Sequence, residues 1–423
     1  MTAFAFQDRL LDRFVRYTAI GTQSNREKAD SGIIPSSDNQ REFAHLLVEE
    51  LRAIGVTDVT LDENCYVLAH VAASSGLEGK KSFGLCAHMD TASDAPGDNV
   101  KPQVHRNWDG KTIALESSFT LDPAFDSELA SCAERADKAG KPDTIITSDG
   151  TTLLGADDKA GIAGIVTLVE YLIKHADVRH GPIELLFSPD EETGHGMDRV
   201  PLAALRSRAF YTVDGGALGE LETECFNAWK ADVTFTGISA HLGAARGKMV
   251  NAVTMAASFV DSLPAQESPE ATDGYYGYFC PLEIGGSAET AKLTVFIRDF
   301  DQSAMNARLA RLDDIASGVR ARFPGGKIEI KKTEQYRNMK EKLDAAPEIL
   351  ALLRKATDRA GVESFMKPIR GGTDGSRLTE LGIPTPNIFT GGHNYHSRTE
   401  WASLSEMTSM VNTLIELARL WGE

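Results

Sequence analysis

The sequence lacks long apolar runs, paired cysteines and an excess of basic residues, and each absence removes a class of protein. No run of about 18 apolar residues occurs, so no membrane-spanning helix is expected. The five cysteines are an odd number, are widely spaced and form no C-x-x-C pair, which argues against a disulfide framework and a thiolate zinc site. With 44 Lys+Arg against 61 Asp+Glu, the formal net charge is −17. Nucleic acid and anionic membranes are therefore not expected as partners.

The N-terminal segment MTAFAFQDRLLDRFVRYTAI contains Asp8 and Asp12 and no uninterrupted apolar stretch. It is expected to form an amphipathic helix and not a signal peptide. Together with the cysteine pattern, which favours a reducing compartment, this predicts a cytoplasmic protein.

Strand-like and helix-like segments alternate along much of the chain. Helical spacing of apolar residues predicts helices over 7–17, 39–54 and 160–175, and again over 346–360 and 403–421. Short β-rich runs lie between 56 and 88, at 183–188 and at 209–213, with a helix-like stretch between the last two. This alternation predicts an α/β fold with a mixed, mostly parallel sheet and helices on both faces.

The pattern changes between residues 225 and 333. Strand 231–236, helix 248–263, strands 277–285 and 291–298, helix 302–322 and strand 327–332 follow one another. This β-α-β-β-α-β order is that of a ferredoxin-like α+β domain. We therefore expect a catalytic domain formed by 1–224 and 334–423, interrupted by an inserted lid, 225–333. The pattern does not place residues 93–145 on the sheet.

Several apolar runs end in histidine or carboxylate side chains. SFGLCAH, IELLFSPDEE, AFYTVD and NIFTGGHNYH lead to His88, Asp90, Glu191, Glu192, Asp214 and His396. The carboxyl ends of the strands in an open α/β sheet line the ligand crevice, so these groups are expected to converge there. Asp157 of GADDKAG adds a further carboxylate to the cluster.

So many carboxylates cannot all be ionised side by side without cations. Histidine and carboxylate ligands without thiolates suit zinc, cobalt or manganese better than calcium or magnesium. Five ligands that include one bridging carboxylate suit a pair of ions, which at about 3.5–4 Å apart activate a shared water. Of two adjacent glutamates, one can bind metal while the other acts as base.

The motifs also resemble a known family. HMDT, TTLLGADDKAGIA, SPDEETG, YTVDGG, FIRDFD, PIRGGTDG and FTGGHNYH are similar, in the same order along nearly the whole chain, to those of the tripeptide aminopeptidases in the M20 metallopeptidase family. The resemblance implies a dizinc α/β catalytic domain with an inserted lid, two Zn²⁺ per subunit, and Co²⁺ or Mn²⁺ as substitutes. By analogy, it also implies a homodimer formed through the lid.

The resemblance further assigns roles to the metal-site residues. Asp157 would bridge the two ions, with His88 and Asp214 on one ion and Glu192 and His396 on the other. Glu191 would be the general base, and Asp90 would orient the ring of His88.

The resemblance assigns four residues of the lid side to the substrate. His241 of GISAH would stabilise the oxyanion, and Arg298, with Asn251 and Arg370, would bind the C-terminal carboxylate of the peptide. Alternatives stay open for Arg298, as an ion pair with Asp299 or Asp301, and for Arg370, as loop support.

Two motifs admit a second interpretation. His393 lies three residues before His396 and competes with it as a ligand, although the family usually has an aromatic residue there. GADDKAG precedes a helix as phosphate loops do, but it lacks the GKS/T ending and its paired aspartates would repel phosphate. The lid turn SAHLG, the segment HSRTE and residues 108–140 depart from the family pattern, mostly on the substrate side.

These observations predict a dinuclear zinc aminopeptidase that releases the N-terminal residue from short peptides, with tripeptides as the expected substrates. The main alternative is an M20-type amidohydrolase, either an acylamino-acid deacylase or a dipeptidase. A third hypothesis is a catalytically inert binding protein that keeps the fold, which the complete ligand set and Glu191 disfavour.

Overall fold

The computed structural model describes residues 6–423, which form two compact units. Unit 1 comprises the residues up to Thr223, together with Lys342–Lys367 and Thr373–Glu423. Unit 2 comprises Glu224–Glu341 and Pro368–Gly372. Met1–Ala5, the start of the predicted N-terminal segment, lie outside the described residues.

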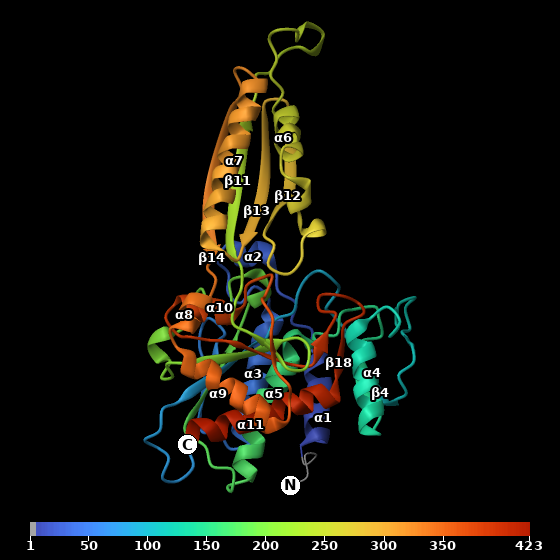
Figure 1. Cartoon of the computed structure of the whole chain (residues 1–423), viewed down its shortest axis with the longest axis vertical. Coiled ribbons are helices and arrows are strands. Elements are labelled where there is room, and N and C mark those ends of the chain that lie inside the picture. Colours follow the sequence, from blue (N-terminus) through green and yellow to red (C-terminus); the bar gives the residue numbers. More distant parts are fainter. Residues whose placement is uncertain (1–5) are drawn as a thin grey trace. The chain divides into compact units, whose positions relative to one another are not determined.

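Unit 1 is built on an eight-stranded mixed sheet (Figure 1). Its strand order is β1 (Asp58–Leu61), β2 (Val67–Val71), β8 (Ile183–Ser188), β3 (Phe83–His88), β9 (Phe210–Gly215), β16 (Asn387–Phe389), β10 (Glu220–Glu222) and β15 (Phe365–Met366). The four central strands, β8, β3, β9 and β16, are parallel to one another. Their carboxyl ends therefore lie along one edge, as the sequence predicted.

Alternating side chains of this sheet enter two separate cores. One core holds Leu85 of β3 and packs against five helices, α1 (Gln7–Thr18), α3 (Asp38–Ala53), α5 (Ala156–Lys174), α9 (Pro347–Ala360) and α11 (Leu404–Gly422). The other holds Cys86 and packs against α10 (Asp374–Glu380) and the segment that follows β8. The central strands are buried on both sides, so they read as continuous apolar runs and not as alternating ones.

The segment 93–145, which the sequence pattern did not place, contributes most of a second sheet. β4 (Gln103–Trp108) and β7 (Asp143–Thr147) pair with two short strands from the end of the chain, β18 (Trp401–Ser403) and β17 (Gly392–His393). Helix α4 (Ser127–Ala139) and a small hairpin of β5 (Ile113–Ala114) and β6 (Thr120–Leu121) complete this part. Its own apolar cluster includes Trp108, Leu129 and Trp401.

Unit 2 has the predicted β-α-β-β-α-β order. Its elements are β11 (Asn227–Thr236), α6 (Ala252–Asp261), β12 (Tyr278–Gly286), β13 (Thr290–Asp299), α7 (Gln302–Arg322) and β14 (Lys327–Tyr336). The strands form an antiparallel sheet in the order β12-β13-β11-β14. Apolar residues of all four strands and both helices share one core. The ferredoxin-like α+β lid fold is thus confirmed.

The expectation of a helix-like stretch after β8 is wrong. The chain there forms only two 3₁₀ turns, Glu191–Thr193 and Leu202–Ala204. Asp190 (φ 55°) and Gly194 (φ 82°) flank the first turn in the left-handed region, which α-helical backbone does not adopt. Helix α6 begins at Ala252 and not at 248, because the side chain of Asn251 caps it.

The remaining short elements are α2 (Arg26–Asp30), α8 (Lys340–Asp344) and the 3₁₀ turns Leu242–Ala244, Ala265–Glu267 and Pro269–Ala271. Within residues 6–423 no helix has the length and apolar character needed to cross a membrane. All five cysteines are free thiols.

Candidate metal centre

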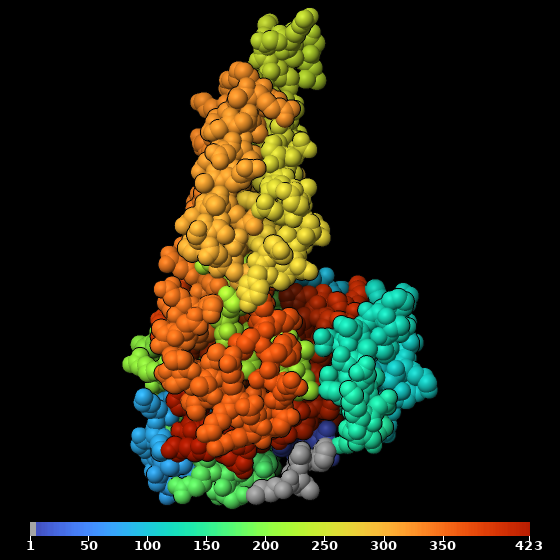
Figure 2. Space-filling model, viewed as in Figure 1, coloured from blue at the N-terminus to red at the C-terminus, as the bar shows by residue number. Residues whose placement is uncertain are grey.

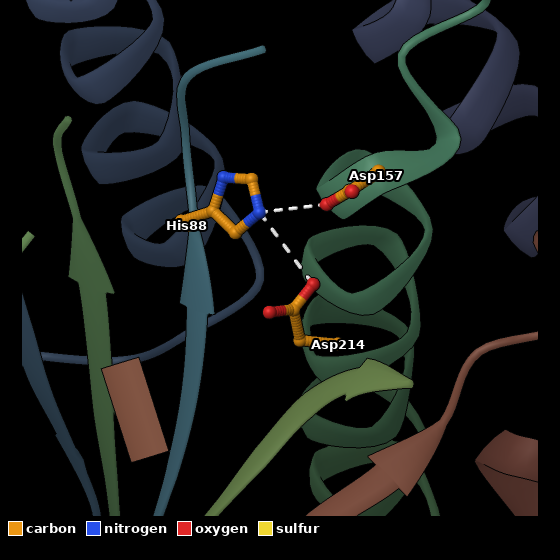
Figure 3. Close-up of side chains that lie close together, drawn as sticks. All are labelled: His88, Asp157 and Asp214. Atoms are coloured by element: carbon orange, nitrogen blue, oxygen red, sulfur yellow. Dashed lines mark hydrogen bonds and ion pairs between the residues drawn. The ribbon is translucent and has the colours of Figure 1, made fainter. Parts of the chain in front are cut away.

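Three of the predicted ligands meet at the carboxyl end of β3 (Figure 3). The ring of His88 points between Asp157, at the start of α5, and Asp214, at the end of β9. His88 Nε2 lies 2.7 Å from Asp157 Oδ1 and 3.5 Å from Asp214 Oδ1. The three side chains form a donor group in which every pair of ligand atoms lies within 4.8 Å.

The other two predicted ligands form a second donor group that shares Asp157 with the first. His396 Nε2 lies 3.3 Å from Asp157 Oδ2 and 3.0 Å from Glu192 Oε1. The two oxygens of the Asp157 carboxylate thus face different groups, Oδ1 the first and Oδ2 the second. The structure therefore brings together all five side chains that the sequence nominated as ligands.

The buried carboxylate of Asp90 holds both the histidine and the glutamates in place. It accepts hydrogen bonds from the backbone amides of Glu191, at 2.9 Å, and Glu192, at 3.2 Å. Its Oδ1 also lies 3.4 Å from Nδ1 of His88, which is nearer, at 3.1 Å, to the backbone carbonyl oxygen of Asp90. Asp90 therefore fixes the turn that presents Glu191 and Glu192, in addition to the orienting contact with His88 that the sequence predicted.

The turn Glu191–Thr193 is held from its other side as well. Asp190, the residue before it, accepts hydrogen bonds from the backbone amide and hydroxyl of Ser36 and, at 2.7 Å, from the side chain of Gln40. Arg26 donates to the carbonyl oxygens of Glu192, at 3.0 Å, and Thr193. These bonds hold the left-handed backbone at Asp190, which is strained for a residue other than glycine.

A buried carboxylate that sequence analysis missed supports the loop of Asp157. Glu400 accepts hydrogen bonds from the amides of Leu154 and Gly155, both at 2.8 Å, and from that of Asp157, at 3.1 Å. The peptide bond between Asp157 and Asp158 is cis. The only sequence signal for Glu400 was its place at the end of HSRTE, a segment judged to lie on the substrate side.

Asp374 of the quoted motif PIRGGTDG is a second buried carboxylate without a predicted role. It accepts a hydrogen bond from the hydroxyl of Ser188, the last residue of β8. Burial raises the pKa of Asp374 to about 7. Its position behind the strand end explains why that motif accompanies the ligand motifs.

His396 and His393 have different surroundings. His396 has a left-handed backbone (φ 61°), and its Nδ1 lies 3.4 Å from Oδ2 of the exposed Asp94. His393 Nε2 lies 2.9 Å from Oε2 of the buried Glu406, and its ring stacks on Trp401. Of the two competing histidines, His396 is thus the one that lies with Asp157 and Glu192.

The proximity and burial of these groups shift their pKa values. Burial by itself lowers the pKa of His88, but the neighbouring Asp214 and Asp157 raise it well above its usual range. Hydrogen bonds to Asp157 and Glu192 raise the pKa of His396 to about 11. Burial raises the pKa of Glu192 to about 8 and that of Asp214 to about 6. The cluster therefore retains protons that bound cations would displace.

The residues present fit a pair of cations. Two histidines and three carboxylates supply the donors, and the shared Asp157 carboxylate offers one oxygen to each group. Glu192 Oε1 is buried and lacks a well-aligned hydrogen bond, although His396 Nε2 lies 3.0 Å away. An orphaned buried oxygen of this kind is costly unless a cation or a donor satisfies it. Imidazole with carboxylate suits zinc and its neighbours in the first transition series.

The four predicted substrate residues belong to unit 2. His241 is exposed, and its Nδ1 accepts a hydrogen bond from the amide of Gly243. Arg298 is buried, donates to the carbonyl oxygens of Trp229 and Ile297, and lies over the ring of Phe296. It forms no ion pair with Asp299, which pairs with Arg308 at 2.7 Å.

Arg370 and Asn251 each have a local structural role in unit 2. Arg370 donates to the carbonyl oxygens of Gly274, Tyr276 and Thr272, in the loop that precedes β12. Asn251 caps α6. Their contact with substrate stays a prediction.

Residues 153–420 match the family described as Peptidase family M20/M25/M40. The chain belongs to this family. Two relatives of this M20 peptidase, both named Peptidase T, come from Geobacillus thermodenitrificans (strain NG80-2) and Listeria welshimeri. They are 43% and 44% identical to it over 419 residues, which cover 99% of this chain and 99% of each relative. The predicted family and enzyme class, a metallo-aminopeptidase, are confirmed.

Solved structures share the fold of this M20 peptidase. Aminopeptidase PepT from Bacillus cereus ATCC 10987 superposes with a TM-score of 0.73 at 20% identity and covers 99% of both chains. A tripeptidase from Staphylococcus aureus subsp. aureus Mu50 gives 0.76 at 20% identity and covers 98% of both. A dinuclear metal-binding M20 peptidase from Bacillus subtilis gives 0.65 at 14% identity and 98% coverage. The predicted fold class is confirmed.

Proposed function

We propose that this M20 peptidase is a dinuclear zinc aminopeptidase that releases the N-terminal residue from tripeptides. The observation that carries the proposal is the pair of donor groups that share Asp157. Relatives that are 43–44% identical over nearly the whole chain and are named Peptidase T support the choice of peptide substrates.

Five side chains would hold the two ions. His88 and Asp214 would bind one, Glu192 and His396 the other, and Asp157 both. When bound, such ions act as Lewis acids toward a carbonyl group and lower the pKa of water. Co²⁺ and Mn²⁺ prefer similar donors and are expected to substitute for Zn²⁺.

Glu191 would carry the proton during hydrolysis. It lies three residues after the end of β8, beside Glu192, and Asp90 fixes its backbone amide. Burial raises the pKa of the Glu191 carboxyl well above its usual range. We assign it the removal of a proton from the attacking water and the delivery of that proton to the leaving amine.

The substrate contacts are proposed from the lid. His241 would stabilise the negative charge that develops on the carbonyl oxygen. Arg298, with Asn251 and Arg370, would bind the C-terminal carboxylate of the peptide. We further propose that the enzyme acts in the cytoplasm and forms a homodimer through the lid.

A panel of free and N-acetylated tripeptides, dipeptides and acylamino acids tests this proposal. The purified protein should cleave free tripeptides, lose this activity on chelation and regain it with Zn²⁺. It should reject N-acetyl tripeptides, because an aminopeptidase requires the free amine. Preference for the blocked substrates would identify a deacylase instead, and the absence of any metal-dependent cleavage would refute the proposed function.

A further inference from the structure

The loop that carries His396 has a backbone that its own residues do not favour. Asn394 (φ 54°) and His396 (φ 61°) both adopt left-handed conformations, which cost energy for residues with a Cβ atom. Such a conformation persists when the surroundings fix it. The surroundings of this loop are the second sheet and helix α4.

Asp126 connects the loop to the start of α4. Its Oδ1 caps the helix by accepting hydrogen bonds from the amides of Glu128 and Leu129. Its Oδ2 accepts from Nδ2 of Asn394, at 2.8 Å, and from Nε1 of Trp401, at 3.0 Å. One carboxylate thus joins the helix, strand β18 and the residue two positions before His396.

A partly buried ion pair connects the loop to the middle of the same helix. Glu406 of α11 is fully buried; its Oε1 pairs with Arg135 of α4, and its Oε2 lies 2.9 Å from Nε2 of His393. The ring of His393 stacks on Trp401 at a centroid distance of 4.0 Å. In Figure 2 the surface around α4 (teal) lies next to that of the C-terminal residues (red), in agreement with these bonds.

The two histidines of these donor groups are positioned by different parts of unit 1. His88 and Asp214 stand at the ends of central strands of the main sheet. His396 stands on a loop that bonds to Asp126 and, through Glu406, to Arg135, while Tyr395 beside it donates to the carbonyl oxygen of Gly215 at the end of β9. A change in α4 can thus alter the second group while it leaves the first intact.

We propose that the α4 region, residues 103–147, sets the affinity of the second donor group for its metal ion, with Asp126 as the positioning residue. This rests on the proposed function, because it requires that His396 binds an ion. Residues that orient a ligand from outside the coordination sphere typically contribute 10- to 100-fold in metal affinity. The region that the sequence did not place thereby gains a role in the metal site.

Metal titration of the chelated full-length protein tests this proposal. Co²⁺ is added to the wild type and three variants and followed by visible absorption, and Zn²⁺ binding is counted by calorimetry. Asp126→Ala removes the acceptor of the hydrogen bond between Asp126 and Asn394. Asn394→Gly removes the donor of the same bond without a change of charge, and glycine suits the left-handed backbone at this position. Asp122→Asn is the matched control, because the side chain of Asp122 bonds only to the nearby amide of Ala124.

The expected result is a split between the two sites. The wild type and Asp122→Asn bind two ions, whereas Asp126→Ala and Asn394→Gly bind the first ion with unchanged affinity and the second about 10- to 100-fold more weakly. Equal affinities for both ions in all four proteins would overturn the inference. A loss of both ions together in Asn394→Gly would also overturn it. If Asp126→Ala does not fold, the result for Asn394→Gly decides. A wild type that binds fewer than two ions would instead refute the proposed function.

Discussion

Asp90 offers the sharpest test of how the site is held together. Its carboxylate is fully buried and contacts both a ligand histidine and the turn of the two glutamates. Asp90→Asn keeps the size of the side chain but replaces one oxygen by an NH₂ group, which donates and does not accept. One of the two amides, that of Glu191 or that of Glu192, then loses its acceptor and faces a donor.

The magnitude follows from the lost bond. A buried amide that loses a charged acceptor costs about 2–3 kcal/mol. If displacement of Glu191 and Glu192 raises the activation free energy by this amount, kcat/KM falls by about 30- to 150-fold, since each 1.36 kcal/mol is a factor of ten.

The assay is tripeptide hydrolysis at saturating Zn²⁺, with thermal denaturation as the control for folding. Asp94→Asn is the matched comparison, because Asp94 approaches the other ligand histidine at the same distance, 3.4 Å, but is 67% exposed. That variant should lose less than about threefold, since solvent competes for its contact. An Asp90→Asn enzyme with kcat/KM within twofold of the wild type would refute this account of the turn.

Two further predictions concern the metal centre, and a third concerns His195, outside it. Glu191→Gln should lower kcat by about 100-fold or more while the protein still binds two ions by mass spectrometry; unchanged turnover would remove Glu191 as the base. Asp157→Asn should weaken both ions and Asp214→Asn only one, so equal metal contents in the two variants would contradict a shared carboxylate. Hydrogen bonds to Asp198 and Asp30 raise the pKa of His195 to about 9, above its unfolded value of about 6.5. Their contribution to stability is therefore complete below about pH 6.5 and disappears as pH rises through about 9. His195→Gln should lose about 1 kcal/mol at pH 6 and nothing at pH 10 in urea denaturation, whereas an equal loss at both would disprove the pairing.

The ligands at strand ends were predictable because their positions follow from local patterns. A buried parallel strand is a continuous apolar run, and the polar residue that ends it lies at the carboxyl edge of the sheet. His88 at the end of β3, Glu192 after β8 and Asp214 near the end of β9 all obey this rule. Asp157 lies at the start of α5 and follows no predicted strand. The resemblance to the M20 family assigned the ligand roles themselves, for all five residues.

The second sheet was not predictable because its pairing joins distant segments. β7 pairs with β18, which lies more than two hundred residues further along the chain, and each strand has five residues or fewer. Short strands of this kind carry little periodicity of their own. The sequence analysis consequently gave Asp126 and Arg135 no role, although Asp126 contacts the loop of His396 and Arg135 reaches it through Glu406.

The turn after β8 shows how tertiary bonds override a local tendency. The segment from Pro189 onward has the composition of a helix start, with acidic residues in its first turn. The buried bonds of Asp90 and Asp190 hold it in a tight turn instead. Neither bond has a signature in the local sequence, because the partners lie about 100 and 150 residues away.

The crowding of acidic groups at one edge of the sheet has a consequence for folding. Strands and loops from distant parts of the chain bring acidic groups together there, and without cations these groups must hold protons or repel one another. Ions that bind only the folded chain stabilise it by about 2.7 kcal/mol per site at a hundred times the dissociation constant. The availability of metal in the cell would thereby set how long the enzyme survives, in addition to how fast it works.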